Sequence, residues 1–108
     1  MDNVAIVVIV ERGKADRIVD EAKKVGAEGA TIFYARGTGE SEFKKFFNLH
    51  VESSKEVILF LTQESKKQEI IDKVVEVGRL KEPGVGILFT LPVGELVGLH
   101  HRGQIGKE

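Results

Sequence analysis

The chain repeats one pattern twice, namely an apolar run, an amphipathic helix and a second apolar run. The first copy covers residues 4–36 and the second covers residues 57–91. A strand, a crossover helix and a neighbouring strand favour a right-handed unit, so the repeat restricts the topologies that the chain can adopt.

In the first copy, residues 4–10 (VAIVVIV) form a continuous β-branched run, which is typical of a strand buried on both faces. Helical spacing begins after Gly13, and Gly26 is placed to end that helix as a left-handed residue. Residues 30–36 (ATIFYAR) predict a second strand. The apolar positions of the helix are Ala15, Ile18, Val19, Ala22 and Val25.

In the second copy, residues 57–61 (VILFL) predict a third strand, and residues 87–91 (ILFTL) predict a fourth that Pro92 would end. Ser65 and Gln68 have the spacing of a capping box at the start of the intervening helix. The apolar and small positions of that helix are Ile70, Ile71, Val74, Val75 and Gly78.

Two interleaved units of this kind predict an α+β, ferredoxin-like βαββαβ sandwich, with a four-stranded antiparallel sheet and two helices on one face. The 108 residues fit a single domain, 1–108, whose uniformly apolar first strand should be central. Between the copies, residues 37–54 predict a long inter-strand loop, and loops of this length are usually functional. Residues 81–86 predict a turn, and residues 93–108 a weakly patterned tail.

Composition excludes several classes of site. The chain has no cysteine, which removes disulfides, thiolate nucleophiles and Cys-based zinc sites. A net charge of -1 argues against a nucleic-acid binder, which usually carries a basic surplus. The apolar run near the N-terminus is too short to span a bilayer and has no export signal beside it, so we expect a cytoplasmic protein with no membrane insertion.

Two glycine-containing segments carry a resemblance to a known family. Residues 29–39 (GATIFYARGTG) resemble the segment with which PII signal proteins finish their second strand and open their T-loop. Residues 84–89 (GVGILF) resemble the B-loop of those proteins, a G-x-G followed by a strand. The resemblance extends over nearly the whole chain, strand for strand and helix for helix.

The resemblance implies a homotrimeric regulator that is not an enzyme and has no cofactor. PII signal proteins bind adenine nucleotides in clefts between subunits, and nucleotide state rearranges the T-loop, which docks on a transporter, an enzyme or another regulator. Glycine at such a site permits positive φ and close approach of backbone N–H groups to an anion. The implied nucleotide-binding residues are Thr31, Gly37, Thr38, Gly39, Gly84, Val85, Gly86 and His100.

The sequence departs from the family where basic residues would hold the nucleotide phosphates. The matching positions are Ile87, Gly98 and His100, and of these only the histidine can carry a charge. Arg36, Arg79 and Arg102 are nearby but out of register. ADP, AMP or a cyclic nucleotide is therefore as plausible an effector as ATP.

Two further features have more than one interpretation. The loop cluster of Glu42, Phe43, Lys44, Phe46 and Phe47 either packs on the protein or forms a partner-binding surface, for example for a membrane transporter or a metabolic enzyme. His50, His100 and His101 suggest the alternative of a metal-binding or structural trimer, although no further ligands lie nearby in the sequence. No set of catalytic acid, base and nucleophile stands out.

Overall fold

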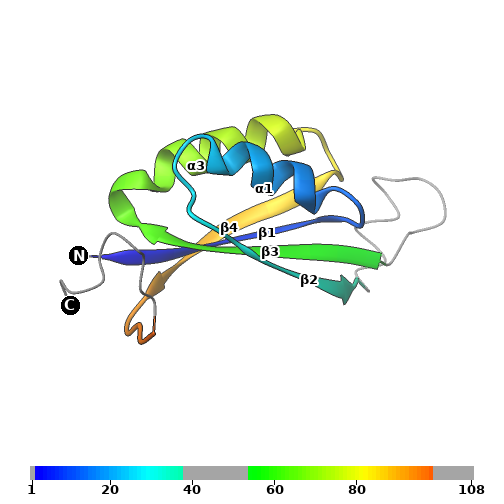
Figure 1. The fold of residues 1–108 in the computed structure, drawn as a ribbon. Coiled ribbons are helices and arrows are strands. Elements are labelled where there is room, and N and C mark those ends of the chain that lie inside the picture. The colour runs from blue at the N-terminus through cyan, green and yellow to red at the C-terminus, as the bar shows by residue number, and fades with distance from the viewer. Residues whose placement is uncertain (1, 38–53, 99–108) are drawn as a thin grey trace.

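A computed structural model describes residues 2–37 and 54–98 and has the predicted βαββαβ order (Figure 1). The four strands form one antiparallel sheet in the order β2-β3-β1-β4. The ferredoxin-like prediction is confirmed, as is the central place of the first strand. The elements are β1 (Asn3–Glu11), α1 (Ala15–Lys23), β2 (Thr31–Arg36), β3 (Ser54–Gln63), α3 (Glu64–Gly78) and β4 (Gly86–Val93).

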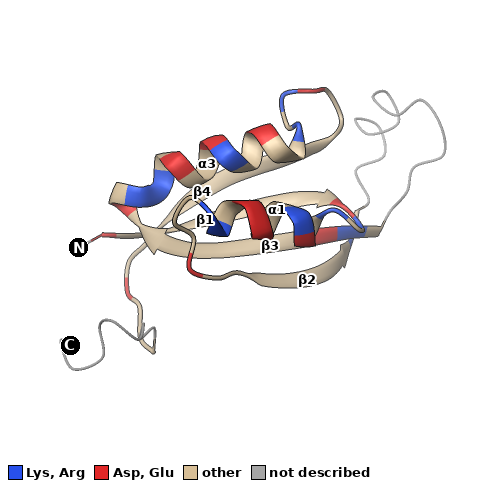
Figure 2. Ribbon diagram, turned by 45° about the horizontal axis from the view of Figure 1, so that its top comes forward, with Lys and Arg blue, Asp and Glu red and all other residues tan. Residues whose placement is uncertain are grey.

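Both helices cover the same face of the sheet and form the core with it (Figure 1). Strand residues alternate between faces, so one set of positions in β1 and β3 points at the helices. The largest fully buried side chains are on this side, and they are Phe60, Ile6, Ile18, Ile58, Ile70, Val8, Val10 and Val74. Charged residues occur along both helices (Figure 2), and none of them is buried.

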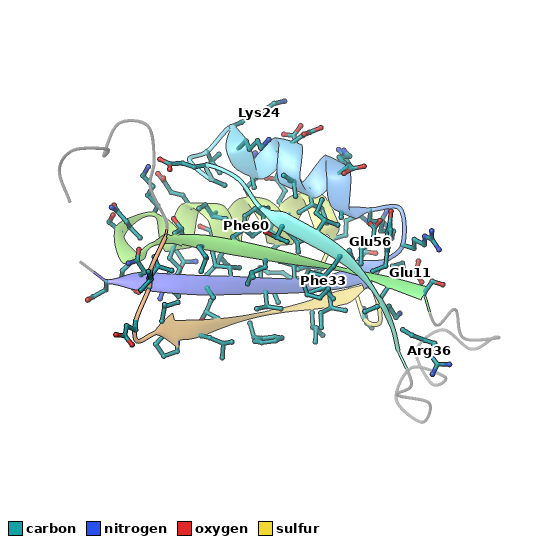
Figure 3. The ribbon with its side chains drawn as sticks, turned by 60° about the horizontal axis from the view of Figure 1, so that its bottom comes forward. Glu11, Lys24, Phe33, Arg36, Glu56 and Phe60 are labelled. Carbon is teal, nitrogen blue, oxygen red and sulfur yellow. The ribbon has the colours of Figure 1, made fainter. Side chains whose placement is uncertain are left out.

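The other face of the sheet carries apolar side chains that residues 2–37 and 54–98 leave uncovered (Figure 3). In register across this face, Val7 of β1 lies opposite Leu59 of β3 and Phe89 of β4. Phe33, Ile87, Phe89 and Leu91 are each between 41% and 51% exposed. The prediction that the first strand is buried on both faces therefore holds in full only for the helical side, since Val7 and Ile9 on the other side are half-buried.

Pro92 does not end the fourth strand, which continues to Val93 and places Pro92 opposite Val4. The prediction was wrong because β4 is an edge strand. A proline lacks the backbone donor that a central strand needs, but an edge strand has one side without partners and tolerates it. The third strand is also longer at both ends than the predicted residues 57–61.

The predicted capping box does not form, because α3 begins at Glu64, before Ser65. Gln63 is the N-cap residue without a side-chain cap, and the Glu64 N–H donates to the Asp2 carbonyl at 3.0 Å instead. Gln68 donates to Asp72 within the helix at 2.9 Å. Gly26 does have a positive φ of +122°, but it lies two residues beyond Lys24, the C-cap of α1.

The helices of the described residues are too short and too polar to cross a membrane.

Candidate functional site

A cavity of about 270 Å³ lies at one end of the sheet and touches all four strands or the turns beside them. Several of its lining residues occupy the uncovered face, where Ile9, Val57 and Ile87 are neighbours in register or on adjacent strands. Ligand pockets are usually larger than this, at about 300 Å³ or more. The lining residues are Ile9, Val10, Ala35, Arg36, Gly37, Lys55, Val57, Gly84, Val85, Gly86 and Ile87.

The cavity brings together the two glycine elements that lie far apart in the sequence. Gly37 follows the end of β2, and residues 84–86 lead into β4. Gly84 has a φ of +77°, which favours glycine over other residues. The sheet order separates β2 from β4 by two strands, so the cavity spans the width of the sheet at this end.

The turn before Gly84 is held by hydrogen bonds at the end of α3. Arg79 is the left-handed C-cap residue of α3, with φ 56°, and its guanidinium donates twice to Glu82, at 2.9 and 3.0 Å. The Arg79 side chain holds the pKa of the Glu82 carboxyl below its ordinary value by hydrogen bonding and by its charge. The Val85 N–H donates to the Glu82 carbonyl at 3.3 Å, which closes the turn next to the cavity.

Gly86 is a glycine for a reason of packing. A Cβ at this position would lie 2.7 Å from the Ile9 carbonyl oxygen and 3.0 Å from side-chain carbons of Val10 and Leu80. The backbone of β4 can approach β1 at this point only without a side chain. Glycine at position 86 is therefore needed for the packing of the strands beside the cavity, and this need does not depend on what the cavity binds.

Two cationic residues line the cavity. Arg36 is the last residue of β2 and is exposed, as Figure 3 shows. Lys55 is the second residue of β3 and only 6% exposed, and it lies opposite both Ala35 of β2 and Glu11 of β1. Sequence reasoning noted Arg36 as a nearby cation but missed Lys55, because a lysine at the start of an apolar strand has no signal of its own.

The predicted nucleotide-binding residues fall into three groups in the structure. Gly37, Gly84, Val85 and Gly86 line the one cavity. Thr31 does not, because it begins β2 while the cavity lies at the end of β2, roughly 16 Å away at strand spacing. Thr38, Gly39, His100 and the loop residues Glu42, Phe43, Lys44, Phe46 and Phe47 lie outside the described residues.

Glu56 links the third strand to the start of α1 beside this site. Its side chain is 7% exposed, and its Oε1 accepts a hydrogen bond of 2.8 Å from the Ala15 N–H. Lys14, the N-cap residue of α1, makes no side-chain cap, so Glu56 supplies the acceptor from another element. A carboxylate here also interacts favourably with the positive end of the helix dipole.

We expect Glu56→Ala to lower the free energy of unfolding by about 1–2 kcal/mol, because the buried Ala15 N–H loses its acceptor. Chemical denaturation monitored by circular dichroism measures this loss. Glu56→Gln is the matched control, since its amide oxygen still accepts, and it should retain most of the stability. An alanine variant as stable as the glutamine variant would contradict this role for Glu56.

Among residues 2–37 and 54–98, no group of three or more His, Asp or Glu side chains comes together as a metal site would require. His50, His100 and His101, on which the metal interpretation depends, lie outside the described residues.

The family model described as nitrogen regulatory protein P-II matches residues 4–102 of this chain. The chain belongs to the P-II family. The match covers both strand–helix–strand copies and the segment between them, and it confirms the resemblance seen in the two glycine elements. P-II proteins are a family of regulators.

Solved structures of P-II proteins have the same fold. Arabidopsis thaliana PII bound to citrate superposes with a TM-score of 0.65 at 23% identity, over 85% of this chain and 78% of that one. A putative PII-like signaling protein from Thermus thermophilus gives a TM-score of 0.61 at 22% identity, over 86% of this chain and 90% of that one. No curated protein sequence matches the chain.

Proposed function

We propose that this P-II family protein is a homotrimeric, cytoplasmic regulator that binds a small anionic effector, in the first place an adenine nucleotide. The observation that carries the proposal is the shared cavity, in which Gly37 and residues 84–86 meet Arg36 and Lys55. The effector binds there and changes how the segment 37–54 fits a partner protein, such as a membrane transporter or a metabolic enzyme. The protein acts by binding and not by catalysis.

The uncovered face of the sheet supports a trimer. A contiguous apolar surface that includes Phe33, Phe89 and Leu91 is costly in water, and such surfaces mark protein interfaces. A domain of this size also buries a smaller share of its surface than a larger one, so that association adds burial that the single chain lacks. The cavity opens beside this face, so a neighbouring copy would close it.

A neighbouring copy would also account for Thr31. Within one chain this residue is at the far end of β2 from the cavity, and it lies on the uncovered face, opposite Leu59. We therefore assign Thr31 to the cavity of an adjacent subunit. Gly37 and the turn 84–86 line the cavity of their own subunit.

In this proposal, effector binding changes the relative populations of two loop conformations. The effector must therefore bind the two conformations with different affinities. Calorimetric titration with ATP, ADP, AMP and a cyclic nucleotide tests the proposal, and we expect at least one of them to bind at micromolar concentration, which corresponds to about 8 kcal/mol. Citrate should be included, since Arabidopsis thaliana PII was solved bound to it.

No heat with any of these ligands at millimolar concentration would contradict nucleotide sensing. If the protein were still trimeric in that case, the result would favour the alternative of a structural or metal-binding trimer. Titration with Zn²⁺ or Cu²⁺, with His100→Ala as the comparison, then separates those two alternatives.

A further inference from the structure

We propose that a second cavity, between the start of α1 and the end of α3, binds a phosphate group, either free phosphate or the phosphate of a small metabolite. This cavity has a volume of about 200 Å³, and the cationic residues Lys14, Arg17 and Arg79 line it. It shares no lining residue with the cavity at the end of the sheet. The inference therefore goes beyond the proposed function and does not depend on it.

The packing of the two helices creates this space. The N-terminal end of α1 and the C-terminal end of α3 lie at the same end of the helical layer (Figure 1). The helices approach closely there, since a Cβ added at Gly78 would lie 3.3 Å from the Cδ1 atom of Ile18. Ile18 and Val77 form the apolar part of the wall. Gly13 and Gly78 also line the cavity, and neither contributes a side chain that would fill it.

The three cationic side chains reach the cavity from both helices. Lys14 and Arg17 are three residues apart at the start of α1, a spacing that places both on the same side of the helix. Arg79 is the C-cap residue of α3. Among the described residues that line the cavity, none carries a carboxylate. The lining is therefore cationic on two sides.

Two carboxylates interact with these cations, and each already has a hydrogen-bond partner. Glu82 accepts hydrogen bonds from Arg79 at 2.9 and 3.0 Å. Glu21 is one turn along α1 from Arg17 and accepts a hydrogen bond from Lys24 at 3.0 Å. The three lining cations and Lys24, set against both carboxylates, leave two positive charges.

The charge surplus comes from side chains and not from the backbone at the start of α1. The Ala15 N–H donates to Glu56 at 2.8 Å and is not available to a ligand. Asp16 and Asp20 are exposed residues of α1, but they do not line the cavity. A ligand at this site would therefore be recognised by the three cationic side chains.

A phosphate group matches this arrangement in charge and in size. A phosphate dianion balances the two positive charges, and arginine binds phosphate oxygens with parallel hydrogen bonds. The bonds to Glu82 use Nε and Nη2 of Arg79, so its Nη1 donors can bind a ligand. The cavity is smaller than the roughly 300 Å³ at which pockets for drug-sized ligands begin, which favours a compact anion over a whole nucleotide.

The test is a titration of the full chain with inorganic phosphate and with glycerol phosphate, followed by amide NMR spectroscopy at constant ionic strength. We expect saturable shifts of the Gly13 and Gly78 amide signals, and much smaller shifts for Gly84 and Gly86, which line the other cavity. Tighter binding of glycerol phosphate would assign the site to a small organic phosphate. Equal or tighter binding of inorganic phosphate would assign it to free phosphate.

Arg17→Gln and Lys14→Gln should each weaken phosphate binding about 5-fold, the upper end of what an exposed ion pair contributes. Lys23→Gln is the matched control, because Lys23 is an exposed lysine of α1 that does not line the cavity. This control variant should bind phosphate as the wild-type protein does.

Three results would overturn the phosphate site. One is the absence of saturable shifts at Gly13 and Gly78 at millimolar phosphate, whether or not Gly84 and Gly86 respond. Another is an equal loss of affinity in Lys23→Gln, which would indicate a general attraction to the charge of α1. The third is preferential binding of an oligoglutamate peptide, which would indicate a docking surface for acidic protein segments. Because the two cavities share no residue, the proposed function would stand in each case.

Discussion

Phe89→Glu is expected to convert the proposed trimer into monomers. Phe89 lies on the uncovered face of β4, opposite Val7, and 41% of its surface is exposed in the single chain. A glutamate there would have to leave water in each copy when the faces associate, and three such carboxylates would also repel one another. The molar mass measured by sedimentation equilibrium should fall from about three times the chain mass of 11.9 kDa to the mass of a single chain.

Tyr34→Glu is the control for this change. Tyr34 is an exposed aromatic residue of β2 whose side chain is on the helical face of the sheet, opposite to the face that carries Phe89. The guanidinium of Arg12 lies 4.6 Å from the centre of its ring. The same gain of charge there should leave the proposed trimer intact. A wild-type protein of monomer mass, or a Phe89→Glu variant that remains trimeric, would show that this face is not the interface.

Gly86→Ala is expected to lower the free energy of unfolding by about 2–3 kcal/mol, the cost of overpacking a site that cannot relax. The added methyl group would lie 2.7 Å from the Ile9 carbonyl oxygen, which belongs to the central strand of the sheet. Either β4 moves away from β1 or the register hydrogen bonds near Gly86 are lost. Denaturant unfolding at a fixed protein concentration measures the change, because association also contributes to stability.

Gly29→Ala is the matched control, since a Cβ there would meet nothing within 4 Å. It should change stability little or raise it slightly, through a less flexible unfolded chain. If the two variants proved equally stable, the close approach of β4 to β1 would not be what requires glycine at position 86. The result also affects how ligand binding is interpreted. If a Gly86 variant binds a ligand weakly, the cause would be the distorted backbone beside the cavity and not the loss of a contact with the ligand.

Much of the fold could be predicted because it depends on local patterns. The alternation of β-branched runs with amphipathic helices is a property of neighbouring residues, and it identified all four strands and both described helices. Errors arose at the ends of elements. Pro92 stayed in its strand because β4 is at the edge, and α3 began at Glu64 because the Asp2 carbonyl was available as a partner.

The candidate site was only partly predictable. Gly37 and residues 84–86, which line the cavity, could be selected from the sequence because glycine at strand ends and turns indicates a special backbone conformation, which depends only on neighbouring residues. Lys55 was not found, since whether a lysine is exposed or lines a cavity depends on the strands beside it. Glu56 was missed for the same reason, because its partner is the backbone of Ala15 on another element.

The order of the elements, the composition of the core and the family follow from the amino-acid sequence alone, because each depends on residue types at regular spacing along the chain. The three-dimensional arrangement was needed to see which side chains share the end of the sheet, why position 86 excludes a methyl group, and which face of the sheet the described residues leave uncovered. These properties arise from strand register and from the side of the sheet on which the helices pack, and both are set by contacts between residues that are distant in the chain.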